Sequence, residues 1–237
     1  MNEPQSLSCP LFRLRHAFFT RHGGVSKPPF DSLNFGGLED EPEKIEENRR
    51  RGLLHLGIDP SSVARLRQVH GTQVCDARPG VQEGDALCTD RPGLALAVAT
   101  ADCYPLLFED AEAGVIGAAH AGWRGTLGRI AEATVEAMVQ RGARRERILA
   151  AIGPGICGEN YEVGEELISA FRDAGFPEAC FLGRRLDLAA ANAFVLRESG
   201  LSATRIWTSG RCSTEGDFFS HRRDRGLTGR MWSVIAI

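Results

Sequence analysis

The sequence predicts a mixed α/β protein that folds as one domain over residues 1–237. Apolar runs of strand length, bounded by glycine and polar turns, occur at 93–100 and 114–120. A helical pattern at 126–143 follows the second run, and another strand-like run, 147–156, follows that helix. The 237 residues contain no repeat, low-complexity tract or long linker, so we expect a single domain.

The segment from 114 to 156 has the pattern of a strand–helix–strand unit. Apolar side chains from Leu127 to Met138 fall on one face of its helix, and Gly142 marks the expected end. If the two strands are parallel, the connection between them is right-handed.

Flanking segments supply further helices and strands. Helices are expected at 40–59, 164–175 and 187–200, and strands at 203–209 and 231–237. The first of these helices has Pro42 in its first turn, with acidic residues at its positive end. Because Ile45, Arg49 and Leu53 follow the helical spacing, we expect Arg49 on the inward face, where a charge needs a partner.

Composition and charge exclude several classes of protein. The chain is 43% hydrophobic and 25% charged, and its net charge of −3 gives no electrostatic footprint for nucleic acid or anionic membrane. We expect no signal peptide, and the sequence contains no apolar run of membrane-spanning length. Seven scattered cysteines without a CxxC pair argue against a disulfide framework. We therefore expect a cytoplasmic protein without a nucleic-acid, membrane or obligate protein partner.

Three residues with soft ligand atoms stand at comparable places in the chain. His70 lies in QVHG, Cys103 follows a buried strand in TADCYP, and His120 ends the run 114–120. Strand ends beside glycine or proline are places where side chains converge. Two imidazoles and a thiolate suit zinc, and three ligands leave a fourth position for water or substrate. The spacing matches no local zinc signature, and a single histidine or cysteine at such a place more often has a structural role.

Other residues near these strand ends have two readings. Asp102 could carry protons or support a metal ligand, or it could be only a turn residue. The amides after His120, with Arg124 or Arg49, could bind an anion such as phosphate, although the glycines there also suit turn geometry alone. The segment 218–230, FFSHRRDRGLTGR, suits a stacked heterocycle and an anionic group, or an ordinary surface loop.

Eight short motifs occur in order between residues 18 and 230: FFTRHGGVS, SLNFG, EENR, QVHG, TADCYP, HAGWRGT, GPGIC…YEVG and FFSHRR…TGR. Together they resemble the laccase-domain family formerly called multicopper polyphenol oxidases. Its members are also described as FAMIN-like or peptidoglycan editing factor-like, and the family is now associated with purine nucleoside phosphorolysis. The resemblance covers nearly the whole chain. It departs at RCSTEG, where the family more often has threonine directly after the cysteine.

The resemblance implies a fold and a site. The fold is a single α/β (α+β) domain with two mixed sheets sandwiched between helices, in four layers α/β/β/α. The zinc ligands of the family fall on His70, Cys103 and His120, and the arginine of its ENR motif falls on Arg49.

The resemblance also implies the chemistry. The expected reactions are phosphorolysis of adenosine, inosine and 5′-methylthioadenosine to free base plus ribose 1-phosphate, and hydrolytic deamination of adenosine. We accordingly expect zinc as cofactor, with copper second, and purine nucleosides and phosphate as partners. Asp102 and Arg49 are the predicted catalytic residues, and Arg49 and Arg124 the predicted phosphate-binding residues.

Other functions stay open from the sequence. A cysteine hydrolase or deamidase, such as one that edits peptidoglycan precursors, would use Cys103 as nucleophile and His120 or His70 as base. A copper-dependent polyphenol oxidase is disfavoured, because the chain has six histidines and no HxH pair. A binding module without catalysis would reuse the fold alone.

Overall fold

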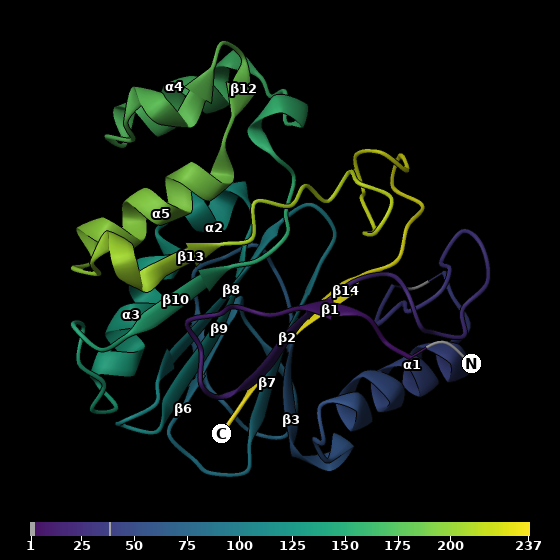
Figure 1. Cartoon of the computed structure of the whole chain (residues 1–237). Coiled ribbons are helices and arrows are strands. Elements are labelled where there is room, and N and C mark those ends of the chain that lie inside the picture. The colour runs from purple at the N-terminus through teal and green to yellow at the C-terminus, as the bar shows by residue number, and fades with distance from the viewer. Residues whose placement is uncertain (1–2, 38) are drawn as a thin grey trace.

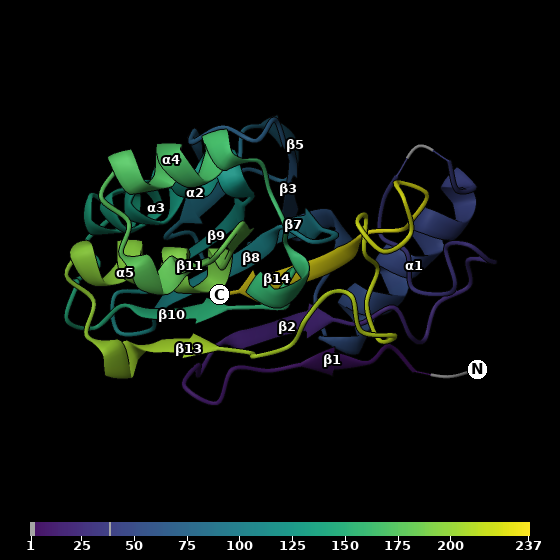
Figure 2. The ribbon, with the colours of Figure 1, turned by 90° about the horizontal axis from the view of Figure 1, so that it is seen from above.

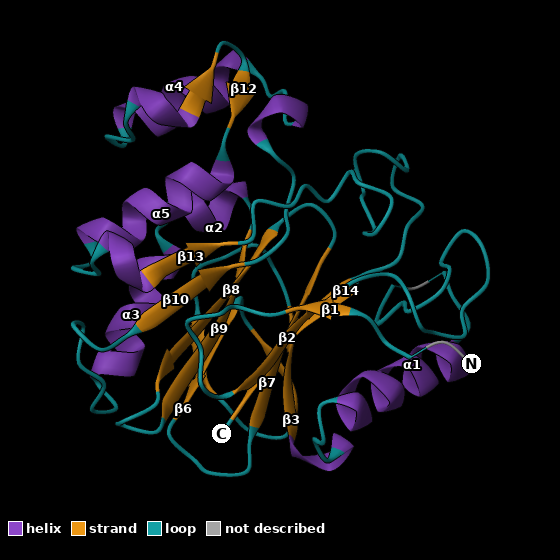
Figure 3. Cartoon of the chain, in the orientation of Figure 1, coloured by secondary structure: helices purple, strands orange, loops and turns teal. Residues whose placement is uncertain are grey.

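The computed structural model describes residues 3–37 and 39–237, so residues 1, 2 and 38 of the predicted domain lie outside the described residues. Two six-stranded sheets pack face to face, and helices cover their outer faces (Figures 1 and 2). These four layers, with parallel and antiparallel pairs in both large sheets, confirm the predicted fold class. Figure 3 shows the helices on either side of the strands.

The first sheet has the strand order β1-β2-β14-β7-β3-β5. Its strands are β1 (Ser6–Leu7), β2 (Arg15–Phe19), β3 (Val63–Arg67), β5 (Gly80–Glu83), β7 (Ala95–Thr100) and β14 (Met231–Ala236). β3 is parallel to β5 and β7, and β14 is antiparallel to β7 and β2. The outer face of this sheet packs against α1 (Pro42–His55), where Leu53 and Trp232 are buried.

The second sheet has the strand order β13-β10-β8-β9-β6-β4. Its strands are β4 (Val74–Asp76), β6 (Ala86–Thr89), β8 (Tyr104–Asp110), β9 (Val115–Ala121), β10 (Leu149–Ile152) and β13 (Ile206–Thr208). The helices on its outer side are α2 (Trp123–Leu127), α3 (Ile130–Val139), α4 (Glu165–Asp173) and α5 (Leu188–Glu198). Side chains of α3 and α5 such as Met138 and Val195 share a core with strand residues such as Phe108.

The remaining regular elements are short. Strands β11 (Phe181–Leu182) and β12 (Arg185–Leu186) form a small hairpin near α4, at one end of the molecule (Figure 1). The 3-10 turns are η1 (Pro60–Ser62), η2 (Gly158–Asn160), η3 (Glu178–Cys180) and η4 (Ala203–Arg205). None of the described helices has the length and apolar character needed to cross a membrane. The cytoplasmic location stays a prediction.

The two sheets share an apolar core. Leu96, Leu107, Ile116 and Ile235, contributed by both sheets, are fully buried in one cluster. β8 and β9 are buried along their whole length because they are covered by the first sheet on one face and by helices on the other. All seven cysteines are free in the structure.

The predicted strand–helix–strand unit is present with two differences. β9 and β10 run in the same direction, but β8 lies between them and is antiparallel to both. The prediction of one helix over 126–143 is wrong, because α2 and α3 are separate helices. Arg129 interrupts them with a left-handed φ of 64°. Gly128 allows the close approach of a neighbouring loop, since a Cβ there would lie 2.6 Å from Thr72 Cγ2.

The strand directions bring several chain segments to one edge of the sandwich. β3 and β7 are parallel, so both end at this edge. β8 begins where β9 ends, with Pro105 opposite His120, and β14 begins where β7 ends, with Met231 opposite Thr100. Motifs that are far apart in the sequence are therefore neighbours here.

Candidate metal centre

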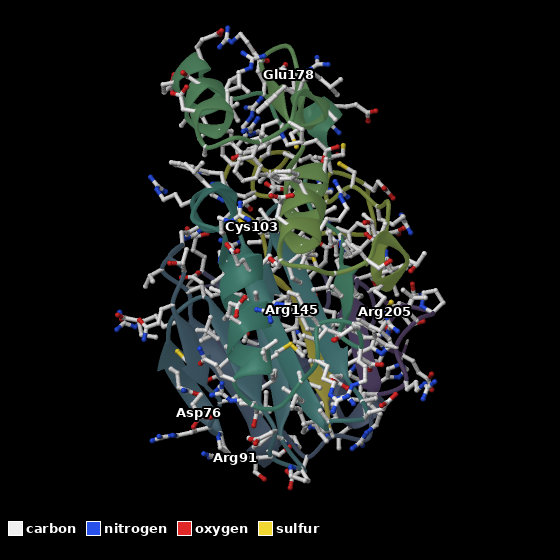
Figure 4. All side chains as sticks on the ribbon, turned by 90° about the vertical axis from the view of Figure 1, so that its left-hand side faces the viewer. Asp76, Arg91, Cys103, Arg145, Glu178 and Arg205 are labelled. Carbon is white, nitrogen blue, oxygen red and sulfur yellow. The ribbon has the colours of Figure 1, made fainter. Side chains whose placement is uncertain are left out.

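His70, Cys103 and His120 come together at this edge, as the sequence predicted. Their ligand atoms all lie within 4.8 Å of one another, and His70 Nε2 is 3.9 Å from Cys103 Sγ. The ring centroids of His70 and His120 are 4.8 Å apart, with the rings at 81°. Figure 4 shows Cys103 between Glu178 at one end of the molecule and Asp76 and Arg91 at the other.

The geometry fits a tetrahedral metal ion. Zinc–ligand bonds of about 2.0–2.3 Å hold the ligand atoms roughly 3.5 Å from one another. The three side chains therefore need to move only slightly to close around an ion. Two imidazoles and one sulfur are also a donor set that zinc and copper both accept.

Asp85, which was not predicted from the sequence, holds two of the three candidate ligands in place. Its Oδ1 accepts hydrogen bonds from His120 Nδ1 at 2.9 Å and from the His70 backbone N–H at 3.0 Å. Its Oδ2 accepts from the Gly71 N–H at 2.6 Å. Because His120 donates through Nδ1, its Nε2 is free to face a metal. The sequence signal was an acid directly before the buried strand β6.

The three candidate ligands change one another's ionisation. Burial disfavours a thiolate, but hydrogen bonds with His120 and His70 outweigh it and lower the pKa of Cys103 to about 6. Burial likewise disfavours an imidazolium, yet Asp85 and Cys103 raise the pKa of His120 to about 9. The site thus favours a negatively charged sulfur, which is the form that binds metals.

Gly122 provides the space that these side chains occupy. A Cβ built on Gly122 would lie 2.9 Å from Cys103 Sγ and 3.1 Å from His70 Cδ2. Its φ of −77° and ψ of 177° suit any residue, so it is space and not backbone conformation that requires glycine here.

The three ligands open onto a cavity of about 580 Å³. Its other lining residues include Gln68, Asp102, Tyr161, His221, Arg222 and Arg230. Gln68 ties the ends of β3 and β7 together, because its side-chain amide bonds both the N–H and the C=O of Ala99 at 2.8 Å. Gln68 and Arg230 were not among the predicted site residues, although they lie in the QVHG and TGR motifs.

Asp102 lies beside the three candidate ligands and within the cavity lining. Its Oδ1 accepts a hydrogen bond from Ser213 Oγ, and its Oδ2 accepts one from the Arg222 N–H, both at 2.6 Å. Among the described residues that line the cavity, Asp102 is the only carboxylic acid. Through its bond with Ser213, Asp102 also connects the site to the RCSTEG segment, where the sequence departs from the family pattern.

The two predicted phosphate-binding arginines do not line this cavity. Arg49 faces inward from α1, as predicted, where its Nε donates to Phe35 O at 3.0 Å and its guanidinium lies 5.4 Å from the Trp232 ring. Arg124 is exposed and stacks on its neighbour Trp123 at 4.3 Å. The structure thus brings the three ligands and Asp102 together, and leaves Arg49 and Arg124 outside the lining.

Comparison with known proteins agrees with the resemblance seen in the sequence motifs. A protein from Deinococcus radiodurans named purine nucleoside phosphorylase is 56% identical over 235 residues, which cover 98% of this chain and 92% of the relative. Adenosine deaminase RL5, from an unknown prokaryotic organism, is 37% identical, with 92% of each chain covered.

Solved structures share the fold. YlmD from Geobacillus stearothermophilus superposes with a TM-score of 0.91 at 35% identity, covering 99% of this chain and 96% of that one. The family model described as multi-copper polyphenol oxidoreductase laccase matches residues 15–237. With the fold, the ordered motifs and this match in agreement, the chain belongs to the multi-copper polyphenol oxidoreductase laccase family.

Proposed function

We propose that this protein is a zinc-dependent purine nucleoside enzyme. Its proposed reactions are phosphorolysis of adenosine, inosine and 5′-methylthioadenosine to base plus ribose 1-phosphate, and hydrolytic deamination of adenosine. The observation that carries the proposal is the His70–Cys103–His120 set, which opens onto a cavity of about 580 Å³. The names of two relatives, a purine nucleoside phosphorylase and an adenosine deaminase, support the substrate class.

The chain's own residues would hold the ion. His70, Cys103 and His120 would be its ligands, and Asp85 would fix the His120 ring through Nδ1. When bound, the ion supplies Lewis-acid chemistry. Zinc is preferred over copper because three protein ligands with one open position are typical of catalytic zinc sites.

The cavity walls offer groups suited to a nucleoside. Tyr161 and Ile156 present apolar surface on which a purine could pack. Asp102, the carboxylic acid of the lining, would accept a proton from the attacking water and deliver it to the leaving amine. Hydrogen bonds from Ser213 and the Arg222 N–H hold this carboxylate at the cavity wall.

Arg49 and Arg124 stay predicted phosphate ligands, and Arg49 a predicted catalytic residue. Each would have to leave its present contact to reach a substrate in the cavity. For Arg49 these are the bond to Phe35 O, the ion pair with Glu46 at 3.3 Å and the Trp232 ring, and for Arg124 the Trp123 ring.

His120→Ala tests the proposal. Adenosine is supplied with and without phosphate, the products are separated by chromatography, and metal is measured on the same sample. We expect about one zinc per wild-type chain, and loss of both the metal and both activities in His120→Ala. His55→Ala, at an exposed position of α1, is the matched control and should behave as wild type. Full metal content and full turnover in His120→Ala, or no nucleoside turnover by the wild type, would show the proposal to be wrong.

One observation supports a second candidate, the cysteine hydrolase. Cys103, with its pKa lowered to about 6 beside two histidines, also has the surroundings of a catalytic nucleophile. Metal content separates the two functions, because a metal bound to the thiolate leaves no free nucleophile. Rapid alkylation of Cys103 in the protein as isolated would favour the hydrolase. A strong thiolate-to-copper absorption band would favour the copper oxidase instead.

A further inference from the structure

Two arginines of the cavity lining have guanidinium groups that form no ion pair with any described residue. They are Arg222 and Arg230. Their close neighbours behave differently, since Arg223 pairs with Asp224 at 2.7 Å and Arg211 pairs with Asp217 at 2.8 Å. Unpaired guanidinium groups at a cavity leave positive charge available to a ligand.

Arg230 is held by two motifs whose role the metal centre does not explain. Its backbone N–H donates to Asn34 Oδ1 at 2.8 Å, and its carbonyl accepts from the Phe35 N–H at 3.0 Å. Asn34 is fully buried. A Cβ on Gly229 would lie 2.8 Å from Asn34 Oδ1, so glycine is needed for this approach. The SLNFG and TGR motifs therefore fix the backbone position from which the Arg230 side chain extends.

The guanidinium of Arg230 is positioned with one edge free. Its Nη1 donates to the carbonyls of Thr228 at 3.0 Å and Gly229 at 2.9 Å. Nε and Nη2 have no hydrogen-bond partner among the residues that the structure describes. Nε and Nη2 lie on the same side of a guanidinium, and this edge matches two oxygens of a phosphate group.

The partial burial of Arg230 favours an anionic ligand. Burial lowers the pKa of Arg230, and the negative charges of Cys103 and Asp102 act against that effect. A partly buried cation without a directly bonded counter-charge is costly, and an anion from solution removes that cost. Arg222, stacked on Tyr161 at 5.1 Å, adds a second cation at the cavity wall.

We propose that Arg230, assisted by Arg222, forms the phosphate subsite of this cavity. The inference rests on the proposed function and names the residues that take its phosphate group. That group belongs either to inorganic phosphate, the co-substrate of phosphorolysis, or to the 5′-phosphate of a nucleotide. Arg49 lies on the other side of Phe35, whose N–H bonds Arg230 and whose carbonyl bonds Arg49. It therefore supports the segment that positions Arg230.

Arg230→Gln and Arg230→Lys test the subsite. Phosphorolysis of adenosine is followed at varied phosphate, and binding of inorganic phosphate is measured separately by calorimetry. We expect Arg230→Gln to raise the phosphate KM at least about tenfold, more than it changes the adenosine KM, because a charge-assisted bidentate contact is lost. The phosphate KM of Arg230→Lys should lie between those of the wild type and Arg230→Gln. Lysine keeps the positive charge but cannot form the two parallel hydrogen bonds of a guanidinium group. The control Arg78→Gln removes an exposed arginine and should match the wild type.

The remaining outcomes separate the possible sources of the phosphate group. If adenosine 5′-monophosphate is turned over, and Arg230→Gln weakens only this substrate, the subsite serves a nucleotide. If the wild type turns over adenosine and Arg230→Gln binds phosphate unchanged, the inference is wrong while the proposed function stands. If Arg49→Gln raises the phosphate KM more than Arg230→Gln does, Arg49 and not Arg230 forms the phosphate subsite. If the wild type turns over no nucleoside, calorimetry with inorganic phosphate still decides the subsite.

Discussion

Gly122, a residue without a side chain, makes room for the candidate metal ligands. We expect Gly122→Ala to weaken metal binding at least about tenfold, because its Cβ would fall 2.9 Å from Cys103 Sγ and displace the ligand set. Nucleoside turnover should fall in proportion. Competition with a chelating dye measures the metal affinity, and circular dichroism checks that the fold is kept.

Gly216→Ala is the matched control for that change. A Cβ on Gly216 meets no atom within 4 Å, so the same substitution there should leave metal affinity unaltered. Equal metal affinity in Gly122→Ala and the wild type would mean that the ligands do not need this space.

At the scale of elements, the central strand β8 depends on a buried acid at its end. Asp110 Oδ2 accepts from the Arg144 N–H at 2.9 Å and pairs with Arg147 Nη2 at 2.9 Å. Burial favours the neutral acid, but these donors outweigh it and lower the pKa of Asp110. The carboxylate therefore ties the chain after α3 to the C-terminal end of β8, at the opposite end of the strand from the site.

We expect Asp110→Asn to lower the free energy of unfolding by about 2 kcal/mol at pH 7. Since the native pKa of Asp110 lies below the unfolded value of about 4, its contribution is fully present above that pH. This contribution is lost as pH falls through the native pKa. The difference in free energy of unfolding between wild type and Asp110→Asn should therefore become smaller in acid. Urea unfolding at pH 7 and at lower pH measures this.

The exposed Asp90→Asn provides the comparison for that series, because it removes the same charge without a buried contact. If the difference in free energy of unfolding between wild type and Asp110→Asn stays constant with pH, the ionised Asp110 does not contribute to stability.

At the scale of the whole molecule, the sandwich depends on the core between its sheets. Leu107 on β8 is fully buried among residues of both sheets. Leu107→Ala should lower the free energy of unfolding by about 2–5 kcal/mol, through lost burial and a cavity that rigid sheets cannot close. Leu54→Ala, 52% exposed on α1, should change it by less than about 0.5 kcal/mol. Urea unfolding measures both, and similar losses in the two variants would contradict this account of the core.

Some features could be predicted from the local sequence. The apolar run that ends at His120, the stripe on α1 and the helices near 164–175 and 187–200 follow from periodicity alone. β8 was missed because Pro105 and the acids Glu109 and Asp110 are unlike a buried strand. The structure explains the acids, since Glu109 accepts the backbone N–H groups of Arg13 and Leu14.

The sequence by itself determined the residue types of the site: soft ligands at His70, Cys103 and His120, set beside strand ends. Only the tertiary structure decided which residues surround them. Asp85 and Arg230 belong to the site because β6, β9 and β14 meet at one edge, which depends on strand directions and long-range pairing. The helical spacing correctly placed Arg49 on the inward face of α1. It could not show that Trp232 lies opposite, because periodicity identifies the buried face of a helix but not the residues that pack against it.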